Sequence, residues 1–482
     1  MPRRFQKPLL LVLAVLFPGT AALLQRDLNN QRTELGLTRV EPLENAPPVL
    51  AFTTVALGSF RGLIANALWI RANEMQMEDK FFEQVQLADW ITKLEPHFVQ
   101  VWLVQAWNMA YNISVKFRDP ADRWRWVRNG IELLRDQGIP YNPKEALVYR
   151  ELAWFFQHKI GQNLDDAHMY YKYAWATEMT QLFGGPRPNF EELLNPKTDE
   201  AKARLQVMTR KYKLEPPLMK KAEEAFGPLE WRLPEAHAIY WATVGLERSN
   251  PKDQITLRRN IYQSLHVSVL RGRIVLARDG SFVFAPDLNK IQPASDGYEK
   301  MIAEETDNPD IVRRAHRGFL KEAIYLLYNY NRTAEANRWM ALTKQKYPDA
   351  FPPDETVESY ALKRLTERIR DVDQNRTKAL VEGWLTQHFE NLILDEDDRA
   401  VAVLRMARQI WDYYDSVSKT RAESRGMEPF PEIYRRVRDS LLDPASGLPP
   451  EYIARLRTKL NLPAPAAPET PEAPRPGAPA PK

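Results

Sequence analysis

The sequence predicts an all-α fold that is built from pairs of amphipathic helices. The main observation is that Pro143–Ala176 carries two apolar stripes at helical spacing, separated by a polar break at Gly161–Asp166. A second observation is that aromatic and alanine-rich stripes of the same kind recur along the chain, whereas only one stretch has strand character. Small residues on the stripes allow two helices to approach closely, and aromatic rings fill the space between them. The two stripes consist of Tyr149, Leu152, Ala153 and Phe156, and then of Ala167, Tyr171 and Ala174.

This helix pair resembles a tetratricopeptide repeat (TPR). The repeat has an aromatic residue, then Leu-Gly and Tyr on its first helix, helix A, and Ala, Phe and Ala on its second, helix B. Here Tyr149 and Leu152 stand in the first two places, Ala153 replaces the glycine, and Pro143 precedes the helix. The resemblance implies a TPR-like right-handed α-solenoid of helix pairs, and it implies a scaffold that binds other proteins.

Composition narrows the possible classes of protein. A chain of 482 residues is long enough for two or three domains or for one extended helical array. The net charge of +4, with no stripe dense in Lys and Arg, argues against nucleic acid as a partner. The chain has no Cys, which excludes disulfides, thiolate metal sites and a Cys nucleophile.

The N-terminal segment 1–24 has the pattern of a signal anchor. Arg3, Arg4 and Lys7 precede Pro8–Leu24, which contains no charged residue. This pattern fits a transmembrane helix, and it also fits a signal peptide that is cleaved. In both cases the basic residues stay in the cytoplasm and the rest of the chain is exported. We therefore expect a single-pass protein of a bacterial inner membrane with a periplasmic bulk, which begins with a polar stalk at 25–47.

Residues 48–183 are predicted to form TPR-like repeats. Pro48–Ile70 fits helix A of a first repeat, with Phe82–Leu94 as its partner. Pro48–Ile70 also fits a second membrane span, although Arg61 near the middle of the bilayer would cost roughly 2.5–3.5 kcal/mol. We favour the repeat helix for this reason.

A degenerate repeat follows. A helix that begins at Val99 places Trp102 and Ala106 in the positions of the family's first aromatic residue and its glycine. Ala121–Asp136 is its predicted second helix. Trp102 and Tyr149 are 47 residues apart, compared with about 34 in a standard repeat. The helix pairing therefore resembles the family, but the strict period does not.

Residues 184–308 are interpreted as an insertion. A breaker cluster at Gly184–Pro188 precedes two helices, Asp199–Tyr212 and Pro217–Phe226. The segment Gly227–Glu247 again has aromatic and small residues at helical spacing, like the repeat helices. We interpret its rings as a packed corner in preference to a ligand site.

The insertion also contains a predicted β-hairpin. Arg273–Ala277 and Ser281–Ala285 are two apolar arms around Asp279-Gly280, a dipeptide that favours a hairpin turn. One hairpin cannot bury its own core, so it is expected to be an excursion from the helical array.

The C-terminal region 309–462 is predicted to be helical again. A further degenerate repeat has Leu320 and Ala323 on its first helix and Ala336 on its second. The tail 463–482 has eight prolines in twenty residues, which predicts a disordered or extended segment. The further helices expected in this region are Thr356–Asp371, Thr377–Leu394, Arg399–Ser418, Pro431–Leu441 and Pro450–Leu460.

Motifs for catalysis are missing from the sequence. It has no glycine-rich phosphate loop, no G-x-S-x-G and no H-E-x-x-H. His158, Asp165, Asp166 and His168 could approach one another, but surface or capping roles are the favoured interpretation because no i, i+4 ligand pair and no Cys accompany them. We expect no enzyme activity, no cofactor and no metal.

The resemblance also implies a partner-binding groove. In TPR proteins, helix A positions 2, 5, 9, 12 and 13 line the concave face and point away from the packing stripe. Aromatic and Arg side chains off a packing face are typical binding hot spots. These positions fall on Gln100, Leu103, Trp107, Ala110 and Tyr111, on Leu147, Arg150, Trp154, Gln157 and His158, and on Gly318, Lys321, Tyr325, Tyr328 and Asn329.

Two interpretations of this groove remain open. In the first, a membrane-tethered scaffold grips one or more protein partners in the cell envelope. In the second, the all-α protein binds or processes glycans, with its aromatic rings stacked on sugars. We favour the first, because the sequence shows no paired carboxylates in a breaker-rich cleft. The rings could also be covered by the insertion and serve as core.

Overall fold

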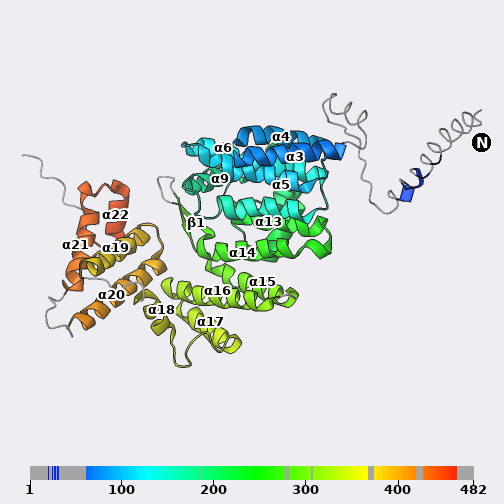
Figure 1. The fold of residues 1–482 in the computed structure, drawn as a ribbon. Coiled ribbons are helices and arrows are strands. Elements are labelled where there is room, and N and C mark those ends of the chain that lie inside the picture. Colours follow the sequence, from blue (N-terminus) through cyan, green and yellow to red (C-terminus); the bar gives the residue numbers. More distant parts are fainter. Residues whose placement is uncertain are drawn as a thin grey trace, which may run out of the picture. The chain divides into compact units, whose positions relative to one another are not determined.

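The computed structural model is mostly helical, which confirms the predicted all-α class (Figure 1). It describes residues 61–463 except for 186, 277–281, 306–307, 367–373 and 420–426, together with a few residues between 20 and 31. The predicted anchor Pro8–Leu24 therefore lies almost entirely outside the described residues, and so does the tail from 464. The chain divides into two compact units, Met1–Phe98 and Val99–Lys482.

The described part of the first unit is a helix pair. Helix α3 spans Arg61–Met77 and packs along α4, Phe81–Leu94. Helix α4 matches the predicted Phe82–Leu94, whereas α3 extends seven residues beyond the predicted end at Ile70. The part of that prediction before Arg61 lies outside the described residues. No helix in the described part of the chain is both long and apolar enough to cross a membrane.

The second unit opens with three helices that each continue into a π-helical turn, and the first and third of them carry predicted groove residues. Helix α5, Val99–Trp107, continues as η2, Asn108–Ile113, and α8, Ala146–Trp154, continues as η5, Phe155–Ile160. Between and after them lie η3 (Ser114–Lys116), α6 (Pro120–Leu133), η4 (Leu134–Gly138), α7 (Ile139–Tyr141) and α9 (His168–Phe183).

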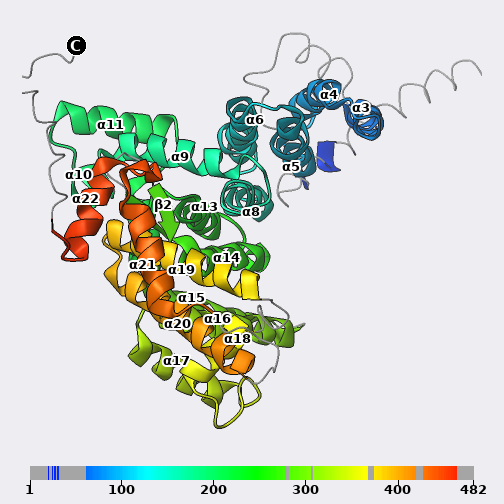
Figure 2. The same cartoon turned by 90° about the vertical axis from the view of Figure 1, so that its left-hand side faces the viewer.

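Helix α13, Pro234–Arg248, is the most deeply buried element. Every side chain from Pro234 to Gly245 is buried, and the helix packs on α8 and on α14, Ile255–Arg271 (Figure 2). A Cβ at Gly245 would stand 2.7 Å from the Tyr149 Cβ, so a side chain here would separate these helices. The aromatic corner at Trp231, His237 and Tyr240 is buried in this core, which confirms its interpretation as packing. Three helices precede it: α10 (Phe190–Leu194), α11 (Asp199–Arg210) and α12 (Pro216–Phe226).

The β-hairpin is present, with both strands inside the predicted arms. Strand β1, Arg273–Leu276, pairs antiparallel with β2, Phe282–Ala285, and Val275 lies opposite Val283. The predicted turn at Asp279-Gly280 lies outside the described residues. Helices α14 and α15, Ile291–Glu304, were not expected from the sequence.

The remaining helices follow the predicted order. Helix α16, Pro309–Asn329, pairs with α17, Thr333–Lys346. Both belong to a cluster of buried side chains that runs from Trp102 to Ala361 and thus spans the repeat region, the insertion and α16–α17. A second cluster runs from Leu365 to Leu456. It is formed by α18 (Val357–Thr366), α19 (Gln374–Ile393), α20 (Asp397–Lys419), α21 (Phe430–Leu442) and α22 (Pro450–Lys459). Short 3₁₀ turns occur at Pro251–Asp253, Leu288–Lys290 and Pro444–Ser446.

Candidate functional site

The predicted groove residues of the first two repeat frames lie on α5–η2 and α8–η5. Trp107 and Trp154 are the last α-helical residues before the two π-turns, and each is followed four residues later by a second ring, Tyr111 or His158. Hydrogen bonds in a π-turn run from i to i+5, so the turn is wider than in an α-helix. In this wider turn, residues i and i+4 lie more nearly above one another along the helix axis, which favours stacking of their rings.

These rings form two stacked pairs that are linked across the two helices. Trp107 stacks on Tyr111 at 5.0 Å between centroids, and Trp154 stacks on His158 at 4.4 Å. The Tyr111 hydroxyl and His158 Nδ1 share a hydrogen bond of 2.9 Å, which links the pairs. The Arg150 guanidinium lies 5.4 Å from the Trp154 ring and ends the row. We call these five residues the aromatic ladder.

The aromatic ladder is more open to solvent than the packing stripe on the same helices. Trp107 is 42% exposed, and the other four members are partly exposed. Leu103 and Leu147, which the groove prediction also includes, are likewise accessible. The stripe residues, in contrast, are buried; they are Trp102, Ala106, Tyr149, Leu152, Ala153 and Phe156.

Charge at the aromatic ladder is concentrated at Arg150. Burial lowers the pKa of the His158 imidazole, and the nearby Lys159 ammonium lowers it further, so the ring is neutral at pH 7. Burial raises the pKa of the Tyr111 hydroxyl, which therefore keeps its proton. The Arg150 guanidinium forms an ion pair of 2.6 Å with the mostly buried Glu151 carboxylate. The surface thus combines uncharged rings with one partly neutralised cation.

Helix α14 supports the aromatic ladder from the inside. The buried Asn260 side-chain amide donates to the Arg150 carbonyl at 3.0 Å. Gln157, which the groove prediction includes, points inward instead, and its amide donates to the Asn260 carbonyl at 3.4 Å. Ala110 is buried as well. Sequence reasoning missed Asn260, since a lone Asn outside any apolar stripe carries no signal of such a role.

The third repeat frame has a different environment. Arg405 of α20 stacks over the buried Tyr328 ring at 4.2 Å, and Gln409 donates to the Tyr328 hydroxyl at 2.9 Å. Arg364 of α18 lies 4.8 Å from the Tyr325 ring. The Lys321 ammonium packs over the Phe351 and Tyr360 rings. Lys321, Tyr325 and Tyr328 are therefore covered by later parts of the chain and do not join the aromatic ladder, whereas Gly318 is exposed.

The candidate metal ligands are occupied by other contacts. The Asp165 carboxylate pairs with the Lys159 ammonium at 2.6 Å and accepts from the Tyr171 hydroxyl at 3.1 Å. His168 lies 3.0 Å from the Lys172 ammonium, and His158 belongs to the aromatic ladder. Within the described ranges, no cluster of three or more His, Asp or Glu could hold a metal ion.

Comparisons with known proteins do not assign a family. No family model, no curated protein and no solved structure matches this chain.

Proposed function

We propose that this chain is a helical-repeat scaffold that binds a protein partner through the aromatic ladder. The observation that carries the proposal is the stack itself, in which four rings and an arginine from two helices form one partly exposed surface. Trp, Tyr and Arg are the residues most enriched at binding hot spots. Tyr111 and Trp154 also pack against the core, but every member of the aromatic ladder keeps part of its surface exposed, which binding explains better than stability does.

The proposed scaffold is a TPR-like solenoid tethered to the outer side of a bacterial inner membrane. Support for the repeat comes from the 47-residue offset, which relates Trp102 to Tyr149 and also Trp107 to Trp154. Both pairs occupy equivalent places on successive first helices. Support for the tether comes from the sequence alone, where basic residues precede the uncharged Pro8–Leu24.

The experiment compares partner retention by three forms of the full chain. Trp107→Ala combined with Trp154→Ala is expected to abolish capture of a protein partner from solubilised native membranes. Tyr170→Ala on α9 is the matched control, because Tyr170 is 40% exposed and is not part of the aromatic ladder. The control is expected to retain the partner.

Melting temperatures measured on the same samples separate binding from folding. A partner that is lost without a change in melting temperature supports the proposal. Equal retention by the double variant contradicts it. If purified envelope glycan binds the native chain and not the double variant, while no protein does, the aromatic ladder is instead a sugar-stacking surface.

A further inference from the structure

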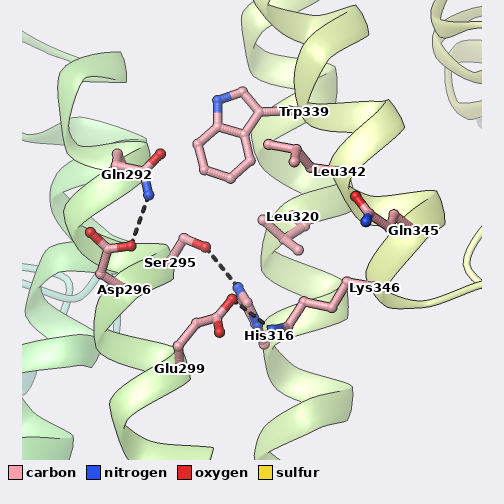
Figure 3. A pocket seen from close by; sticks show the side chains of 10 residues that line it. All are labelled: Gln292, Ser295, Asp296, Glu299, His316, Leu320, Trp339, Leu342, Gln345 and Lys346. Carbon is pink, nitrogen blue, oxygen red and sulfur yellow. Dashed lines mark hydrogen bonds and ion pairs between the residues drawn. The ribbon is translucent and has the colours of Figure 1, made fainter.

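A second candidate site lies between three helices of the C-terminal half. A pocket of about 430 Å³ is walled by α15 on one side and α17 on the other, with α16 beneath (Figure 3). This volume is within the range of small-ligand sites. None of the residues that line it belongs to the aromatic ladder.

The floor of the pocket is a buried hydrogen-bond chain. Ser295 Oγ lies 2.9 Å from His316 Nε2, and His316 Nδ1 lies 3.0 Å from the Tyr347 hydroxyl. The Tyr298 ring stacks on the imidazole at 5.3 Å. Burial lowers the pKa of His316 to about 4, so the ring is neutral at pH 7. The floor therefore brings no charge to the pocket.

This chain of hydroxyls and imidazole is not a hydrolytic site. Ser295 lies within helix α15, where backbone N–H groups are engaged along the helix. A serine nucleophile needs free donors for the oxyanion of its intermediate. His316 is also oriented by a tyrosine hydroxyl and not by a carboxylate.

The walls carry an excess of one negative charge. The Glu299 carboxylate of α15 forms an ion pair of 2.7 Å with the Lys346 ammonium of α17. Lys346 is the cationic side chain among the lining residues, and its charge is therefore neutralised. Asp296, one helical turn before Glu299, accepts a hydrogen bond of 2.8 Å from the Gln292 amide. Among the described residues, Asp296 has no cationic partner. The pocket is therefore suited to a ligand that brings a positive charge.

An indole donor and an apolar wall complete the pocket. Trp339 is only 6% exposed, and its indole extends from α17 into the space facing α15 (Figure 3). No side chain or carbonyl of the described residues accepts from the indole N–H, and the nitrogen is not enclosed in the core. It can therefore donate to the carbonyl of a ligand. Leu320 and Leu342 provide the apolar surface beside it.

We propose that this pocket binds a primary ammonium group that is carried beside a carbonyl and an apolar side chain. The ammonium pairs with the Asp296 carboxylate, the carbonyl accepts from the Trp339 indole N–H, and the side chain packs on Leu320 and Leu342. This combination occurs at the N-terminus of a polypeptide and in a free amino acid. The proposal goes beyond the scaffold function, and it uses none of the residues on which that function depends.

The test measures binding of small probes to the full chain by calorimetry. Leucinamide is expected to bind, whereas N-acetylleucinamide, which lacks the charge, is not. Asp296→Asn is expected to weaken leucinamide about two- to fivefold, the effect of an ion pair with an exposed carboxylate. Asp199→Asn is the charge-matched control and is expected to bind normally, since Asp199 is fully exposed on α11.

A second variant tests the carbonyl contact. Trp339→Phe is expected to weaken leucinamide and to leave 3-methylbutylamine unchanged, because that amine has the same apolar arm and charge but no carbonyl. Tighter binding of leucyl-glycyl-glycine than of free leucine assigns the ligand to a polypeptide N-terminus, and the reverse order assigns it to a free amino acid. Equal binding of the acetylated probe, unchanged binding by Asp296→Asn, or no binding of leucinamide at millimolar concentration overturns the proposal.

Discussion

The helix faces of α8 and α16 were predicted to be equivalent, but their environments in the structure are opposite. On α8, Arg150 and Trp154 form part of a partly exposed stack that ends at Trp107. On α16, Tyr328 lies beneath Arg405 and Gln409 of α20. The two faces carry similar residues, since both combine aromatic rings with a basic side chain. Their residue types therefore do not decide which of them is open.

The difference shows that later parts of the chain select the accessible surface. Helices α18 and α20 both pack on α16, whereas Trp107 of α5 is 42% exposed. Aromatic residues on α16 thus contribute to the stability of the fold. Those of the aromatic ladder on α5–η2 and α8–η5 remain partly exposed to solvent.

The largest expected effect is on the covered face. Tyr328→Ala removes a buried ring and its contacts with Arg405 and Gln409, and should lower the free energy of unfolding by about 3–5 kcal/mol. Tyr328→Phe keeps the ring and should cost only about 1 kcal/mol through the lost hydroxyl. Denaturant unfolding followed by circular dichroism measures both. A small loss in Tyr328→Ala would mean that α20 does not stabilise this face.

Acid should also destabilise the fold through His316, which is buried on α16. The pKa of His316 is about 4 in the folded protein and near 6.5 when unfolded, so the unfolded state binds the proton first as the pH falls. The contribution of neutral His316 to the free energy of unfolding is therefore fully present above pH 6.5, and it is lost as the pH falls from 6.5 to 4. From pH 7 to 5 this one residue should reduce the free energy of unfolding by about 2 kcal/mol.

The measurement is the free energy of unfolding at pH 7 and at pH 5, taken from unfolding curves of the native chain and of each variant. His316→Gln should reduce the pH dependence clearly. His158→Gln should reduce it less, because His158 in the aromatic ladder is partly exposed and its pKa is lowered in the same direction. If the free energy of unfolding depends on pH equally in the native chain and in His316→Gln, His316 is not the source of the acid sensitivity.

The smallest expected effect is on the open face. Trp107→Ala should cost about 0.5–1.5 kcal/mol, because the variant loses one stacked pair and leaves no closed cavity. The thermal unfolding midpoint should therefore stay close to that of the native chain. A loss as large as that in Tyr328→Ala would show that Trp107 serves the core, and the contrast between the two faces would disappear.

Much of the local structure could be predicted from the sequence. Apolar spacing correctly predicted α4, α12 and α16, and two apolar arms around Asp-Gly correctly predicted the two strands. Helix α14 was missed because buried polar residues interrupt its apolar pattern. Ser268, for example, donates to the Ser264 carbonyl at 2.9 Å inside the core. A side chain that satisfies its own helix backbone can be buried without being apolar.

Helical spacing by itself determined which side chains share a face, because the angle between residues along a helix is a local property. It placed Trp102 and Tyr149 on the packing side, and Trp107 and Trp154 on the other side. Only the tertiary structure decided that Gln157 turns inward to Asn260 and that Tyr328 lies under α20. These contacts join residues 81 and 103 positions apart, and no local periodicity contains information about partners at such separations.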